Sequence, residues 1–256
     1  MVSRLKVTDL DFDVIKANLK EFLNQQSEFS DYNFEGSSLS ILIDLLAYNT
    51  HYNAYYLNMI ANEAFLDTSL LRDSVVSHAK LLGYIPASRN SPVAIVDIEI
   101  ETNSTAIDSF TMTRGTKFAS EVINDFSYNF TTIENYTVTK SETKYRFENI
   151  ELYEGTLNTV LFTQADASNP NQLFVIPDKN VDTRTIRVLV KENPSNTSSD
   201  SYTLSTDILD LSSTSKAFFL QEGRNEFFEI FFGDGYISKK LPDGAQVTVT
   251  YLVSNG

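Results

Sequence analysis

The chain has 256 residues, and its 20 basic and 34 acidic side chains give a formal net charge of −14. A negative balance of this size repels phosphate backbones and anionic lipid surfaces, which argues against nucleic-acid partners and membrane partners. The sequence contains no cysteine, so disulfides, thiolate metal sites and cysteine nucleophiles are excluded. Leu, Ile, Val and Phe make up about 30% of the chain, whereas disordered acidic chains fall below roughly 20%, so a packed fold is expected.

The N-terminal residues contain no uninterrupted apolar run of the kind found in secretory signals. The most apolar run, residues 39–48, is short and includes Asp44, so it falls far below the ~18 apolar residues that cross a bilayer. These features, together with the absence of cysteine, predict a soluble protein made in a reducing cytoplasm.

Apolar residues at three- and four-residue spacing predict a first helix that begins near residue 12. Asp11 or Thr8 is suited to cap it, because either side chain accepts hydrogen bonds from amides of the first turn. The apolar positions of this helix are Phe12, Ile15, Leu19, Phe22 and Leu23. A loop over residues 27–36 is predicted to follow.

A second helix is predicted from Ser38 to about Phe65, roughly 40 Å long at 1.5 Å per residue. Its polar positions share one narrow face, which consists of Ser40, Asp44, His51, Asn58 and Asn62. The remaining arc is apolar over more than half of the circumference, whereas a helix at the surface of a monomer needs a stripe of only ~100°. Most of this helix is therefore expected to be buried.

A ladder of tyrosine and asparagine residues lies within this apolar arc. Four of the 13 tyrosines are at positions 48, 52, 55 and 56, and Asn49 and Asn53 are one helical turn apart. One interpretation is a closed core between the first and third helices, with the amides bonded to backbone. The other is an intersubunit bundle, which tyrosine suits because its ring is apolar and its hydroxyl is polar. The breadth of the arc favours the bundle, and the predicted interface residues are Phe12, Ile15, Leu19, Phe22, Leu42, Leu45, Leu46, Tyr48, Tyr52, Tyr55 and Tyr56.

A third helix is expected after a break at residues 67–69, where Asp, Thr and Ser are all suited to capping. Its apolar positions, Leu70, Leu71, Val75, Ala79 and Leu82, recur at helical spacing. Gly83 is suited to end the helix, and Pro86 prevents its continuation.

Beyond Pro92, apolar residues recur at every second position instead of every third or fourth, as at residues 96–101, 186–191 and 247–253. Such alternation predicts antiparallel strands with one buried face. Further strands are predicted near residues 116–123, 126–139, 144–154, 157–164 and 172–177, and an exposed loop is predicted over Glu192 to Ser201. We therefore predict an α+β fold, in which a three-helix interaction region at residues 1–88 precedes a mainly antiparallel β-sandwich or open barrel at residues 89–256.

Two Asp-Gly turns are predicted to frame the last strands. Gly233, Asp234 and Gly235 follow an aromatic run, and Asp243 and Gly244 precede the final alternating segment. Glycine permits the positive φ of tight turns, and aspartate bonds to nearby backbone amides. A calcium loop is the alternative, but the longer series of alternating ligands that it requires is missing. Structural turns are therefore predicted.

No catalytic site, metal site or cofactor is predicted. His51 and His78 lie on different helices and lack the short spacing of metal-binding histidine pairs. Acidic pairs such as Glu99 and Glu101 are frequent in so acidic a chain. A glycosidase needs two carboxylates at a defined separation, which the sequence by itself does not establish.

Two blocks of sequence carry a family resemblance. The first, in the helical region, consists of DFDVIK at 11–16, FEGSSL at 34–39, LLAYNT at 45–50, FLD at 65–67 and LRDSVVSHAK at 71–80. The second consists of FGDG at 232–235, LPDG at 241–244 and VTVTY at 247–251. Together they resemble the N-terminal portion of the baseplate wedge protein of T-even-like contractile-tailed phages, within the baseplate J-like family. The helical block is long and specific, whereas the second block alone is weak.

The resemblance implies a structural, non-enzymatic protein of the virion tail baseplate that is assembled in the host cytoplasm. In that family two copies join a second baseplate wedge protein in each wedge and link the wedges into an inner ring around the hub. The helical part enters intersubunit bundles close to neighbouring wedge or clamp proteins and the sheath initiator, and the ring reorganises as the sheath contracts. Members are usually longer, so this chain is expected to be an N-terminal portion.

Two alternatives stay open from the residues alone. The acidic strands, rich in Thr and Asn, also suit a tail-associated receptor-binding or polysaccharide-hydrolase β-domain, which would have a cleft with two facing carboxylates. The tyrosine-rich helix also suits a cytoplasmic adaptor that binds a peptide helix.

Overall fold

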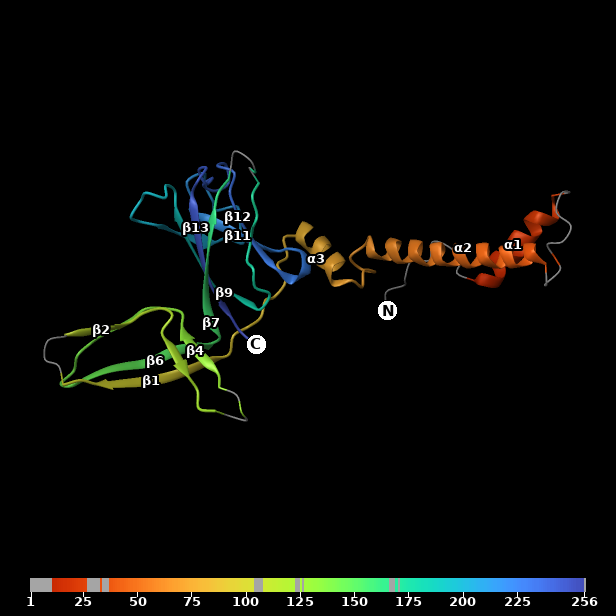
Figure 1. Cartoon of the computed structure of the whole chain (residues 1–256). Coiled ribbons are helices and arrows are strands. Elements are labelled where there is room, and N and C mark those ends of the chain that lie inside the picture. The colour runs from red at the N-terminus through yellow and green to blue at the C-terminus, as the bar shows by residue number, and fades with distance from the viewer. Residues whose placement is uncertain are drawn as a thin grey trace. The chain divides into compact units, whose positions relative to one another are not determined.

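The computed structural model describes residues 11–26, 33, 37–103, 108–122, 125, 127–165, 169 and 171–255. The chain divides into a helical unit that ends at Tyr84 and a β unit that begins at Ile85. Three helices followed by mainly antiparallel sheets confirm the predicted α+β fold class (Figure 1). Among the described residues, no helix is long and apolar enough to cross a membrane.

Side-chain caps begin the first two helices, α1 (Phe12–Asn24) and α2 (Ser38–Glu63). Asp11 Oδ1 accepts hydrogen bonds from the amides of Asp13 and Val14 at 2.9 and 3.4 Å, which confirms one of the two predicted caps for α1. The other candidate, Thr8, lies outside the described residues. Ser37 caps α2 in the same way, because its Oγ accepts from the Ser40 amide at 3.0 Å.

The predicted cap of α3 (Arg72–Leu81) is wrong. Leu71 occupies the N-cap position and makes no side-chain cap hydrogen bond. The Glu63 carboxylate, at the end of α2, instead accepts from the amides of Leu70 and Leu71 at 2.9 and 3.2 Å. These hydrogen bonds, the one from Leu70 above all, hold the pKa of the Glu63 carboxyl below its usual range.

Gly83 ends α3, as the sequence predicts. It has a φ of +74°, and the amides of Gly83 and Tyr84 donate to the carbonyls of Lys80 and Ala79 at 3.0 and 3.1 Å. This pair of bonds is the Schellman arrangement, in which a residue in the left-handed region satisfies the last carbonyls of the helix.

The first sheet of the β unit has the strand order β1-β6-β4-β3, all antiparallel. Its strands are β1 (Val93–Glu101), β6 (Lys144–Glu154), β4 (Asn129–Thr132) and β3 (Lys117–Ala119). A two-stranded ribbon, β2 (Ser109–Met112) with β5 (Tyr136–Thr139), contributes Met112 to the buried cluster formed by this sheet. Tyr145 and Phe147 on β6 are at the centre of that cluster, with Phe110 of β2 in ring contact with both.

The second sheet has seven described strands in the order β7-β13-β9-β10-β11-β12-β8, and among these β10 and β11 pair in parallel while the other neighbours are antiparallel. Its strands are β7 (Thr156–Thr163), β13 (Gln246–Val253), β9 (Val181–Lys191), β10 (Asp200–Leu204), β11 (Ala217–Glu222), β12 (Phe228–Phe232) and β8 (Phe174–Val175). The sheets of the β unit curl into a half-barrel and a nearly closed barrel, and the larger core contains Val188, Val249 and Ile230. The loop predicted over Glu192 to Ser201 ends before Asp200, because Asp200 and Ser201 belong to β10 and pair with β9.

Candidate interaction surface on the longest helix

The face of α2 that packs within the chain is narrow, and apart from Ile43 its buried residues are small or polar. The buried residues of α2 are Ser40, Ile43, Ala47, Ala54 and Asn58. Helix α1 contacts α2, and Lys16 of α1 forms an ion pair with Asp44 on this face. Small side chains such as Ala47 let two helices approach closely, whereas the tyrosine-bearing side does not.

The prediction that most of α2 is buried is therefore wrong within this chain. The face predicted to be polar is the covered one, and the wide apolar arc is open to solvent. Each predicted interface residue of α2 is between 41% and 62% exposed; these residues are Leu42, Leu45, Leu46, Tyr48, Tyr52, Tyr55 and Tyr56.

Four further apolar side chains of α2 extend this surface: Ile41, Leu57, Met59 and Ile60. Helical spacing places them on the same arc as the predicted interface residues. We call this surface, formed by the exposed apolar residues from Ile41 to Ile60, the α2 arc. An exposed apolar surface this continuous is typical of protein–protein contact sites.

The predicted interface residues of α1 divide between the two kinds of surface. Phe12, Ile15 and Leu19 are half-buried, whereas Phe22 is 61% exposed. Only Phe22 of this set is therefore as accessible to another chain as the α2 arc.

On the side of α2 that bears the α2 arc, two tyrosines bond to each other along the helix, and so do the asparagines Asn49 and Asn53. Tyr48 Oη donates to Tyr52 Oη at 2.9 Å, and the two rings meet edge to face with their centroids 4.6 Å apart. Asn53 Nδ2 donates to Asn49 Oδ1 at 3.0 Å, so the amides bond to each other. The hydrogen bond with Tyr52 raises the pKa of the Tyr48 hydroxyl. These polar groups therefore make part of their possible hydrogen bonds within the chain itself, without a partner chain.

The two histidines have separate surroundings. His51 is half-buried, and its ring centroid is 6.1 Å from that of Tyr52. His78 Nε2 is 2.9 Å from the carbonyl oxygen of Glu63. Within the part of the chain that the structure describes, no three His, Cys, Asp or Glu side chains are grouped so that they would hold a metal ion.

In the β unit, Asp234 accepts hydrogen bonds from the amides of Tyr236 and Ile237 at 2.9 and 3.3 Å. Gly233 packs against Ser238, whose carbonyl oxygen would lie only 2.6 Å from an added Cβ, and Gly235 has a φ of +93°. In the second turn the Ala245 amide donates to the Pro242 carbonyl across Asp243 and Gly244, and the Gly244 amide donates to Gln164. The Asp234 carboxylate is therefore used within the first turn, and backbone amides of both turns are hydrogen-bonded within the chain.

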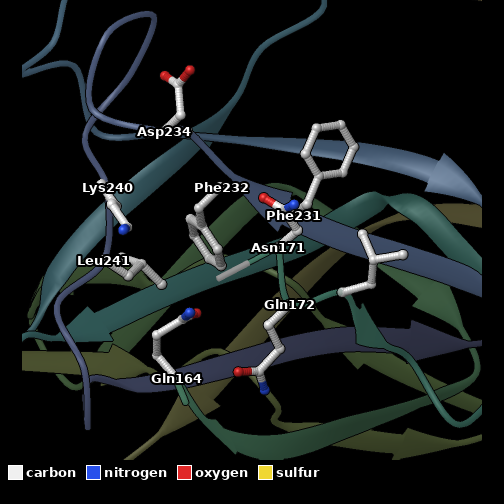
Figure 2. Close-up of a pocket in the computed structure, with 10 residues that line it drawn as sticks. Gln164, Asn171, Gln172, Phe231, Phe232, Asp234, Lys240 and Leu241 are labelled. Carbon is white, nitrogen blue, oxygen red and sulfur yellow. The ribbon is translucent and has the colours of Figure 1, made fainter. Parts of the chain in front are cut away.

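A pocket of about 210 Å³ opens beside the first of these turns (Figure 2). Among the described residues that line it, Asp234 carries the one carboxylate, alongside Lys240 and the rings of Phe231 and Phe232. Gln172, which also lines it, donates to the Thr163 carbonyl and accepts from the Ala165 amide. A second pocket, of about 310 Å³, likewise contains one carboxylate, that of Glu154. In the part of the chain that the structure describes, neither pocket brings together the two carboxylates that glycoside hydrolysis requires.

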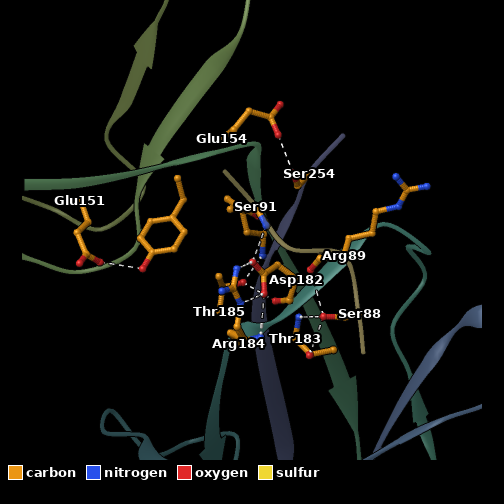
Figure 3. Close-up of polar contacts among 12 residues, drawn as sticks. Ser88, Arg89, Ser91, Glu151, Glu154, Asp182, Thr183, Arg184, Thr185 and Ser254 are labelled. Carbon is orange, nitrogen blue, oxygen red and sulfur yellow. Dashed lines mark hydrogen bonds and ion pairs between the residues drawn. The ribbon is translucent and has the colours of Figure 1, made fainter. Parts of the chain in front are cut away.

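Two buried carboxylates that the sequence did not single out bind the first and last segments of the β unit to its strands (Figure 3). Asp182, with 0% exposure, accepts from the Ser91 amide at 2.9 Å and from the Arg184 guanidinium at 2.6 Å. Glu154 accepts from the Ser254 hydroxyl at 2.6 Å and from the Asn255 amide at 3.2 Å. Burial raises the pKa of the Asp182 carboxyl, but the hydrogen bonds from Arg184 and Ser91 outweigh it, so the pKa lies below its usual range.

Comparison with known proteins gives a family for this arrangement. Residues 11–84 match the helical domain of gp6-like baseplate wedge proteins, and residues 159–253 match the third domain of the bacteriophage baseplate wedge protein gp6. The chain is 32% identical over 246 residues to baseplate wedge protein gp6 of Enterobacteria phage T4, which covers 94% of this chain. The chain belongs to the baseplate wedge protein family.

The matched ranges follow the structural division of the molecule. The first ends at Tyr84, where the helical unit ends, and the second extends from β7 to the last residue of β13. The seven-stranded sheet is therefore the counterpart of the third domain of the family. The chain spans about 35% of the length of the T4 relative.

Proposed function

We propose that the chain is a structural component of a phage tail baseplate wedge and that other chains cover its α2 arc in an intersubunit helical bundle. The observation that carries this proposal is the exposure of Leu42, Leu45, Leu46 and their neighbours, which no described part of the same chain covers. Burial of apolar surface is worth roughly 25 cal/mol per Å², so an arc of this length provides a large driving force for association.

The proposed partners are a second copy of the chain and a second baseplate wedge protein, with neighbouring wedge or clamp proteins and the sheath initiator close by. In this proposal the copies link wedges into an inner ring around the hub of the virion baseplate, after assembly in the host cytoplasm. The β unit serves as a rigid spacer, because its two cores and buried carboxylates fix its internal geometry. Packed helix interfaces of this kind hold one ring state until sheath contraction favours another.

Sedimentation velocity of the full chain, alone and with the recombinant second wedge protein, tests the proposal. The wild-type chain is expected to form complexes larger than the monomer. The double variant Leu45→Glu and Tyr56→Glu places two charges in the α2 arc, and association is expected to weaken by at least about a hundredfold. Both side chains are exposed in the chain itself, so its circular dichroism is expected to stay unchanged.

A matched control is available in the β unit. Leu209 and Tyr236 are each 85% exposed, so Leu209→Glu with Tyr236→Glu adds the same charges outside the α2 arc. This control is expected to associate like the wild type. Equal affinity of the α2-arc variant and the wild type would refute the proposal.

A further inference from the structure

We propose that Asn49 and Asn53 set the axial register of two α2 helices, one from each of two copies of the chain, when their α2 arcs pack together. This inference rests on the proposed helical bundle and deepens it. It names the partner for this part of the arc and the residues that select one alignment.

The two asparagines lie at the centre of a regular seam. Leu42, Leu46, Asn49, Asn53, Tyr56 and Ile60 follow one another at spacings of four, three, four, three and four residues. This is the spacing of the positions that meet along the axis of a coiled coil. All six side chains are exposed in the chain, so the complete seam is available to a second helix.

The amide pair makes one alignment better than its neighbours. Two coiled helices slide past each other at little cost when every seam position is apolar, because a shift of one turn still places apolar groups opposite apolar groups. An amide placed opposite leucine or isoleucine loses water without gaining a hydrogen bond, so such alignments are disfavoured. A polar residue at a seam position specifies register in coiled coils for this reason.

The internal hydrogen bond of the pair defines what a partner must offer. Asn53 Nδ2 already donates to Asn49 Oδ1, so the amide hydrogens of Asn49 and the carbonyl oxygen of Asn53 remain for another chain. The pair therefore presents a donor at one end and an acceptor at the other. A second asparagine pair presents the same two groups and is the simplest complement.

Charge also favours a second copy. Residues 45–62 of α2 contain no Asp, Glu, Lys or Arg, although the chain as a whole has a net charge of −14. A seam without flanking charges lacks the ion pairs by which coiled coils select a different partner chain. Two copies therefore meet along an uncharged surface, despite the repulsion expected between the rest of the two acidic chains.

The absence of native cysteine allows a direct test in the full chain. Single cysteines are introduced at Leu42, Leu46, Tyr56 or Ile60, variants are mixed in pairs, and oxidative crosslinks are mapped by mass spectrometry. With Asn49 and Asn53 present, one pairing of positions is expected to exceed those one turn away by about tenfold or more. In the double variant Asn49→Leu and Asn53→Leu, the copies are expected to associate at least as tightly, while the crosslinks spread over several pairings.

Thr50→Val serves as the control, because Thr50 is exposed, is not a seam residue, and its hydroxyl bonds to a backbone group, the Leu46 carbonyl. This variant is expected to keep the single dominant crosslink. Circular dichroism checks that every variant folds.

The outcomes separate this inference from the proposed bundle. One dominant crosslink in both backgrounds would show that other residues set the register, so the inference would fail while the bundle stands. If the copies do not crosslink while the chain still associates with the second wedge protein in sedimentation velocity, the second-copy partner would be overturned and the bundle left intact. If the wild-type chain associates with neither partner, both proposals fail.

Discussion

The helical unit and the β unit bury their apolar residues to very different degrees. In the seven-stranded sheet, Val188, Val249 and Ile230 have 0% exposure and belong to one continuous core. On α2, the buried apolar residues among those described are Ile43, Ala47 and Ala54, while Leu45 and Ile60 are more than 60% exposed. The β unit thus has the core of a self-sufficient domain, whereas the helical unit has a surface that suits contact with other chains.

Core truncation is expected to give the largest contrast between the units. Phe174, 1% exposed, packs its ring against Phe162 and Phe232, so Phe174→Ala is expected to lower the free energy of unfolding by about 3–5 kcal/mol. Phe22→Ala removes the same kind of ring from a 61% exposed site and is expected to change the free energy of unfolding by less than about 0.5 kcal/mol. Urea unfolding monitored for each unit measures both values, and similar losses would break the comparison.

The buried carboxylate of the β unit predicts a smaller effect that depends on pH. Asp182→Asn removes the charge that pairs with Arg184 and is expected to cost roughly 1–3 kcal/mol at neutral pH. Because hydrogen bonds hold the folded-state pKa of Asp182 below the unfolded value of about 3.9, this stabilisation is complete above that pH. It is lost as the pH falls through the folded-state pKa.

The difference in unfolding free energy between wild type and Asp182→Asn is therefore expected to shrink below about pH 4. Urea titrations at several pH values measure it. Asp108→Asn, at an exposed position, is the control and is expected to show no such dependence. A difference that stays constant into acid would contradict the role assigned to the Asp182 carboxylate.

The smallest expected effect concerns the end of α3. Gly83 has a φ of +74° with no atom within 4 Å of an added Cβ, so Gly83→Ala introduces only the strain of the left-handed region. That strain is about 1 kcal/mol and is expected to fray the last turn of α3 while leaving the β unit unaffected. Amide hydrogen exchange of Gly83 and Tyr84 checks this. Unchanged protection of these two amides would show that the Schellman bonds do not hold this helix end.

The sequence predicted most elements because their signals are local. Asp11 and Ser37 lie directly before apolar helical repeats, and the alternation at residues 247–253 needs no distant partner to be read. The cap of α3 was missed because Glu63 reaches it through space, from the end of another helix. Strand β10 was missed for a similar reason, since its polar residues become a strand only by pairing with β9 and β11.

For the candidate surface, the sequence predicted the width of the apolar arc but not which face would be covered. The spacing of apolar residues predicts which side chains share a face of one helix. Which face another helix covers depends on how closely that second helix can approach. Ala47 and Ala54 permit that approach on the face that also bears Ser40 and Asp44. The roles of Asp182 and Glu154 depend on contacts with residues about 90 to 100 positions away, which no local pattern indicates.

Hydroxyl-radical footprinting of the four tyrosines of α2 tests the central proposal most directly. The full chain is labelled in isolation and within assembled baseplates, with Tyr236, 85% exposed in the β unit, as a reference side chain for labelling dose. The account predicts that Tyr48, Tyr52, Tyr55 and Tyr56 are labelled readily in the isolated chain and are strongly protected after assembly. Equal labelling of these side chains in both states would contradict it.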